Sequence, residues 1–145
     1  MRSARRCVLV AAIVAVAGCA HDCTKIGCIA GVDIAVTKEF AVDVLPVSVT
    51  TCADDVCNTG RIDKSMTAPD RTTFGVGGSV VLEEKRERDV AVTFEVRSVS
   101  TGEVLVKASG TARLERSQPN GDGCEPVCYG ANLTYPGTGD LLEDQ

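Results

Sequence analysis

Apolar residues recur at every second position through most of this 145-residue chain, and this period constrains the fold more than any other feature. Strict alternation of apolar, often β-branched residues with polar ones is typical of β-strands that are buried on one face. With the segment 57–63 included, the pattern predicts about seven strands between residues 32 and 135. The alternating positions are Val32, Ile34 and Val36; Val47 and Val49; Phe74, Val76, Val80 and Leu82; Val90, Val92, Phe94 and Val96; Val104, Val106, Ala108, Ala112 and Leu114; and Val127, Tyr129, Ala131, Leu133 and Tyr135.

Turn-forming sequences separate these predicted strands. Thr101-Gly102 predicts a tight hairpin, the charged run 83–89 a solvated hairpin turn, and the segment 117–123 a longer loop. About seven short antiparallel strands predict an all-β fold, a disulfide-stabilised two-sheet β-sandwich of immunoglobulin- or transthyretin-like architecture, with a small closed barrel as the alternative. The segment 45–52, Leu-Pro-Val-Ser-Val-Thr-Thr-Cys, is similar to strands of the carboxypeptidase-regulatory-like β-sandwich modules of secreted bacterial proteins.

The N-terminal segment has the organisation of an export signal. Three arginines lie among the first six residues, and an uncharged apolar run follows over residues 7–17. Val16-Ala17-Gly18-Cys19 then places an aliphatic residue and two small residues before a cysteine. This segment resembles the lipobox of bacterial prolipoproteins. The resemblance implies that signal peptidase II removes residues 1–18 and that Cys19 carries the lipid that anchors the domain in a membrane.

Two other interpretations of this segment compete with the lipobox. A membrane-spanning helix needs about 20 apolar residues, roughly twice the length of this run. An ordinary secretory signal with the cleavage motif Ala15-Val16-Ala17 would release a protein without an anchor. In lipoproteins of two-membrane bacteria an Asp after the lipidated cysteine favours retention at the inner membrane. Ala20 occupies that position here, so we expect the outer membrane or the cell surface. The expected organisation is a lipoprotein signal peptide at 1–18, a lipidated tether at 19–28, a β-sandwich domain at 29–135 and a flexible acidic tail at 136–145.

The number of cysteines supports the lipobox. Of eight cysteines, Cys7 leaves with the signal peptide and Cys19 is lipidated, so an even number remains for disulfides in an exported protein. Local closure is favoured for Cys52 and Cys57, which flank a predicted hairpin turn. The pairing of the other four stays open between local bridges and links that join the first cluster to the last, such as Cys28 to Cys124 or Cys128. The six are Cys23, Cys28, Cys52, Cys57, Cys124 and Cys128.

Few features of the sequence indicate catalysis or a cofactor. The spacings C-x4-C and C-x3-C differ from the C-x2-C of zinc knuckles and of thioredoxin-like sites. The one histidine, His21, lies in the tether, so a Ser-His or Cys-His pair is not available in the domain. The adjacent carboxylates Asp54/Asp55 and Glu83/Glu84 would point to opposite faces of a strand. We therefore expect no catalytic residue, no cofactor and no metal, and we interpret the loop 120–125 as a turn rather than a calcium site.

The net negative charge of the mature chain restricts the kinds of partner that it could bind. Loss of the three arginines in residues 1–18 leaves 12 basic against 20 acidic residues, a formal charge of −8, which argues against nucleic acid. Trp is absent and the aromatic residues number five, so an aromatic ligand platform is not indicated. We expect a non-catalytic binding or structural module on the cell envelope, whose partner besides membrane lipid is an envelope protein or glycan. The alternative is an enzyme or accessory domain acting on envelope polysaccharide or peptidoglycan.

Overall fold

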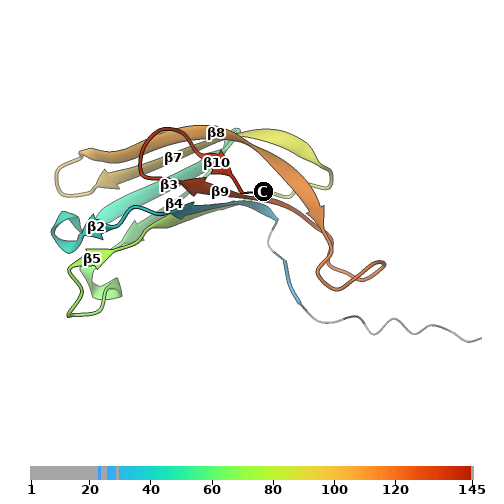
Figure 1. Ribbon diagram of the computed structural model, residues 1–145, viewed down its shortest axis with the longest axis horizontal. Coiled ribbons are helices and arrows are strands. Elements are labelled where there is room, and N and C mark those ends of the chain that lie inside the picture. Colours follow the sequence, from blue (N-terminus) through green and yellow to red (C-terminus); the bar gives the residue numbers. More distant parts are fainter. Residues whose placement is uncertain (1–22, 24–25, 29, 145) are drawn as a thin grey trace, which may run out of the picture.

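A computed structural model describes residues 23, 26–28 and 30–144 and shows an all-β domain whose strands run along its long axis (Figure 1). The all-β prediction is confirmed. None of the described residues forms a helix long and apolar enough to cross a membrane. The elements are β1 (Gly31–Val36), β2 (Phe40–Ala41), η1 (Val42–Val44), β3 (Val47–Ala53), β4 (Val56–Ile62), η2 (Lys64–Met66), β5 (Thr73–Phe74), β6 (Gly77–Val81), β7 (Arg88–Ser98), β8 (Val104–Ser117), β9 (Cys128–Tyr135) and β10 (Leu142–Glu143).

The main strands form one continuous sheet rather than the two separate sheets expected. Its order is β4-β3-β7-β8-β9-β1-β6, with β10 added to β9, while β2 and β5 form a small pair of their own. The long strand β8 explains the difference, because it pairs with β7 over most of its length and with β9 through residues 115–117, and so joins the two layers. The pair β1 and β9 is parallel, contrary to the fully antiparallel expectation. The sheet therefore curls into a nearly closed barrel, close to the alternative architecture.

The core follows the predicted alternation. Along β7, Val90, Val92, Phe94 and Val96 are almost fully buried, whereas the residues between them point outward. Burying an aliphatic or aromatic side chain of this size contributes about 1.5–3 kcal/mol, so one face of β7 alone is a major source of stability. The other buried apolar residues of the core are Val32, Ile34, Phe40, Val47, Val49, Ala53, Phe74, Val76, Val80, Leu82, Val106, Ala108, Ala112, Leu114, Leu133, Tyr135 and Leu141.

The C-terminal segment packs on the barrel and is not the frayed tail expected for residues 136–145. Leu141 is 6% exposed, and its backbone N–H donates to Ser109 O at 3.0 Å. Gly110 makes this contact possible, since a Cβ there would lie 3.0 Å from the Leu141 Cβ. Glu143 Oε1 also accepts a hydrogen bond from Arg113 N at 2.7 Å. One buried leucine and a two-residue strand are too short a pattern to predict from periodicity.

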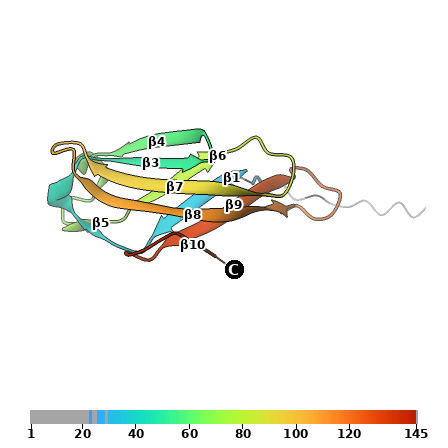
Figure 2. The same cartoon turned by 90° about the horizontal axis from the view of Figure 1, so that it is seen from above.

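The two ends of the barrel differ in what they carry. The chain enters at one end, beside the loop 118–127, and β2 and β5 lie at the opposite end in both views (Figures 1 and 2). The charged run 83–89 lies near the entry end. It was expected to form a hairpin, but it connects β6 to β7, which are not paired with each other. The run does not close a hairpin because β6 pairs with β1, and β7 pairs with β3 and β8.

Candidate functional site

Two disulfide bonds fasten the start of the domain to the loop 118–127 and to the first residue of β9. Cys23 is bonded to Cys124 and Cys28 to Cys128, with Cα–Cα distances of 5.7 and 6.1 Å. We call the segment 23–30 the neck. These bonds link the first cysteine cluster to the last, one of the alternatives that the sequence left open. Cys7, Cys19, Ala20 and His21, on which the lipoprotein interpretation depends, lie outside the described residues.

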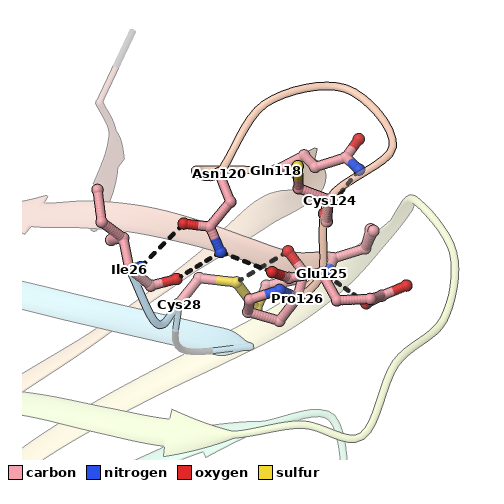
Figure 3. The surroundings of a disulfide bond; sticks show 9 residues. Ile26, Cys28, Gln118, Asn120, Cys124, Glu125 and Pro126 are labelled. Atoms are coloured by element: carbon pink, nitrogen blue, oxygen red, sulfur yellow. Dashed lines mark hydrogen bonds between the residues drawn. A yellow bond between two sulfur atoms is a disulfide. The ribbon is translucent and has the colours of Figure 1, made fainter. Parts of the chain in front are cut away.

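Asn120 reinforces the neck with hydrogen bonds to main-chain groups (Figure 3). Its Oδ1 accepts from Ile26 N at 2.9 Å, and its Nδ2 donates to Ile26 O at 2.9 Å and to Glu125 O at 2.6 Å. The amide thus bonds both main-chain groups of Ile26, as a neighbouring strand would. Gln118 Nε2 stabilises the same loop by donating to Cys124 O at 2.8 Å. The sequence predicts a turn at 120–125, and nothing in the neighbours of Asn120 indicates this distant contact.

The side-chain oxygens of Asn120 and Glu125 accept hydrogen bonds within the protein. The Asn120 amide is 7% exposed and holds the neck, and Glu125 Oε2 accepts from Val127 N at 3.1 Å. Within the part of the chain that the structure describes, no three His, Cys, Asp or Glu side chains gather in a way that could hold a metal ion. The loop is therefore built as a clamp for the neck.

The third disulfide closes the β3–β4 hairpin. Cys52 and Cys57 stand directly opposite each other in the register and are bonded, with a Cα–Cα distance of 4.0 Å. This is the local pairing expected from the sequence. Asp54, in the turn between them, has a φ of 51°, a left-handed conformation that Asp tolerates better than most residues. Three disulfides in one small domain indicate an oxidising compartment outside the cytoplasm.

Arg88 binds one carboxylate from each of the two adjacent acidic pairs, 54/55 and 83/84. Its guanidinium donates to Asp54 Oδ2 and to Glu84 Oε1, each at 2.6 Å, and Asp54 Oδ1 also accepts from Ala91 N at 2.9 Å. The hydrogen bonds from Arg88 hold the pKa of both carboxyls below their usual values, and the pKa of Arg88 is raised in turn. The cluster fastens the hairpin turn to the run 83–89. A carboxyl group that acts as a general acid at neutral pH needs a raised pKa, whereas the pKa values of these two carboxyls are lowered.

A cleft of about 380 Å³ lies where the two ends of the sheet, β4 and β6, meet. We call this line of contact the seam. The strands are not paired there, and Asn58 Nδ2 crosses the seam to donate to Ser79 O at 2.9 Å. Thr51 is among the residues that line the cleft, and its Oγ1 is the one buried side-chain oxygen without a partner among the described residues. The lining residues are Asp33, Val49, Thr51, Asn58, Gly60, Arg61, Ile62, Gly77, Gly78 and Ser79.

Comparison of the chain with protein-family models, with curated proteins and with solved structures finds no match.

Proposed function

We propose that this chain is an exported lipoprotein whose β-domain is a non-catalytic binding module, held at a bacterial membrane by lipid on Cys19. The observation that carries the proposal is the neck. Cys23 follows the lipobox cysteine by four positions and is bonded to Cys124. An extended chain reaches about 3.3–3.6 Å per residue, so at most about 14 Å would separate the lipidated residue from the first disulfide. A tether this short holds the barrel close to the membrane.

The neck also sets the orientation of the domain. The end with the loop 118–127 faces the membrane, and the end with β2 and β5 points away from it (Figure 2). Two or three acyl chains on one cysteine anchor a protein stably, whereas a single chain holds it only marginally. Because Ala20 follows Cys19, we place the protein at the outer membrane or the cell surface. The face available to an envelope protein or glycan is the side and far end of the barrel.

The polar clusters support binding rather than catalysis. Asp54 and Glu84 share Arg88 in ion pairs that keep both carboxylates ionised. Asn120 is committed to the neck. The residues that line the cleft at the seam are neutral, apart from Asp33 and Arg61. These groups suit recognition through hydrogen bonds.

Lipid labelling tests the proposal directly. The chain is expressed in a bacterium supplied with alkyne-palmitate, and wild type is expected to take up label, to sediment with membranes and to begin at Cys19 by mass spectrometry. Cys19→Ala should lose the label and leave the membrane fraction. Cys7→Ala is the matched control and should behave as wild type, because that residue leaves with the signal peptide. An unlabelled wild-type protein that begins at Gly18 would identify an ordinary secretory signal and refute lipid anchoring.

A further inference from the structure

We propose that the seam accepts an extended peptide segment of another protein as an added strand between β4 and β6. The inference rests on the proposed binding function and assigns it a class of partner. Its basis is the main chain at the two ends of the sheet. β4 is paired with β3 on one side only, and β6 with β1 on one side only. Each strand therefore presents an edge of backbone N–H and C=O groups to the seam, and such edges are templates for another strand.

A strand inserted at the seam would pair antiparallel with one edge and parallel with the other. Around the sheet from β4 to β6 there are five antiparallel pairings and one parallel pairing, so β4 and β6 run antiparallel across the seam. The bond from Asn58 Nδ2 to Ser79 O places a side-chain amide where the N–H of a neighbouring strand would bond. Asn58 thus acts as a latch that satisfies one carbonyl of the β6 edge. An entering strand replaces this latch.

Glycines leave the main chain of the seam accessible. Gly60, Gly77 and Gly78 line the cleft and cover none of its backbone. Gly60 stands opposite Val49 in the register, so a side chain at residue 60 would point to the cleft side of β4, and a Cβ there would meet no atom within 4 Å. A Cβ at Gly78 would overlap Thr51 Oγ1 and Phe94. The cleft therefore has no room for a side chain at Gly78 but has room for one at Gly60.

The cleft also indicates the chemistry of the segment. Thr51 is 1% exposed and its unpaired hydroxyl lies against Gly78, so it becomes available to a short polar side chain only when the seam opens. Val56 and Val81 are exposed at the end of the seam nearest the neck and offer apolar contacts to β-branched residues. The lining holds one carboxylate and one guanidinium, those of Asp33 and Arg61, and Arg61 is ion-paired with Asp63, which favours a segment without strong net charge. We expect an extended segment with a small polar residue between β-branched ones.

Entry of a strand requires β4 to move outward. Neighbouring strands lie about 4.8 Å apart, so a strand between β4 and β6 needs a gap of about 10 Å, wider than the span that Asn58 bridges. β4 is suited to this movement because all its residues except Ile62 are exposed and one edge alone is paired. Loss of the latch should favour the open seam. A neutral hydrogen bond contributes about 1 kcal/mol net, which corresponds to roughly fivefold tighter binding by an Asn58→Ala chain.

The probe is a phage-displayed library of random ten-residue peptides, selected on the full-length lipidated protein in detergent and counter-selected on detergent micelles without protein. Gly60→Val fills the cleft from its open wall, and Gly75→Val is the matched control, since a Cβ at residue 75 also meets no atom within 4 Å but lies outside the seam. Selected peptides are synthesised and titrated by fluorescence anisotropy. Binding should weaken at least tenfold in Gly60→Val, stay unchanged in Gly75→Val and strengthen about fivefold in Asn58→Ala. Hydrogen exchange should show new protection in β4 and β6.

Several results would overturn the inference. These are a library without enrichment, peptides that bind Gly60→Val as well as wild type, and protection confined to other strands. A dimer in light scattering that Gly60→Val dissociates would assign the seam to a second copy of this chain. Equal thermal midpoints of Gly60→Val and wild type verify that the variant folds, and Asn58→Ala tests the seam without filling it. Peptide binding by Cys19→Ala is measured in parallel, so loss of anchoring and loss of binding are distinguished.

Discussion

Removing one disulfide of the neck should lower the free energy of unfolding only modestly, whereas removing both should cost more than the sum of the two single losses. They close nearly the same loop, because Cys23–Cys124 spans a sequence separation of 101 residues and Cys28–Cys128 one of 100. With one bridge intact, the other closes a small ring made of the segments 23–28 and 124–128. Closing a ring of about eleven residues removes chain entropy from the unfolded state that is equivalent to about 2.8 kcal/mol, against about 4.7 kcal/mol for a loop of about 100 residues.

The expected losses follow from these two ring sizes. Replacing either pair of cysteines with alanine should lower the free energy of unfolding by about 2.8 kcal/mol, and replacing both pairs by about 7.5 kcal/mol. The quadruple variant therefore loses about 2 kcal/mol more than the two single losses together. Each pair contains one buried half-cystine, Cys124 or Cys128, so the packing loss is similar in both.

Guanidinium unfolding of Cys19→Ala chains, purified after export to an oxidising compartment, measures these losses. The reference is the same chain with all three disulfides, and mass spectrometry verifies that each variant keeps the remaining bridges. The reasoning is refuted if one bridge alone costs nearly 5 kcal/mol while the other is intact, or if the quadruple variant loses only the sum of the single losses. Replacing Cys52 and Cys57, whose ring is short, should cost about 2 kcal/mol in any background.

Three further predictions concern single residues. Thr51→Val removes a buried hydroxyl without a partner and should raise the free energy of unfolding by about 1 kcal/mol, whereas a loss would mean that the hydroxyl has a partner in solution. Leu141→Ala should cost about 2–5 kcal/mol in denaturant unfolding, and a cost near zero would show that the C-terminal segment is not packed. Because the pKa values of Asp54 and Glu84 are lowered in the folded state, their stabilisation is present above their unfolded values and is lost as the pH falls through the lowered ones. Midpoints measured between pH 7 and about pH 2 should therefore fall less steeply for Arg88→Met than for wild type, and parallel curves would contradict the role of the cluster.

Alternation was sufficient to predict the strands that form the core. In β7 each apolar residue expected to face inward, from Val90 to Val96, is buried. The hairpin disulfide Cys52–Cys57 was also predictable, because a local turn brings the two cysteines together. Period two assigns side chains to faces but carries no information about which strand lies beside which. The parallel pairing of β1 with β9 was therefore beyond the sequence, as was the curling of the sheet through β8.

The neck and the seam depend on contacts between distant segments. The partners of Cys23 and Cys28 lie about 100 positions away, and the residues between allow many pairings of the same cysteines. The contact of Asn120 could not be predicted either, because its partner Ile26 is 94 residues away in the sequence and shares no sequence pattern with it. The seam arises only after the sheet has curled, so Asn58 and Gly60 look like ordinary strand residues until β6 is placed opposite them.

The bond between Cys23 and Cys124 also decides how the domain responds to mechanical tension. If an anchored N-terminus and the C-terminal segment were pulled apart, the force would pass from Cys23 straight to Cys124 and along β9. Strands β1 to β8 lie inside the covalent loop and outside the path of the force. Even complete unfolding would then add little to the length of the molecule, because the loop cannot extend while the bond is intact. In a pulling experiment, chemical reduction should convert a short extension into one several times longer.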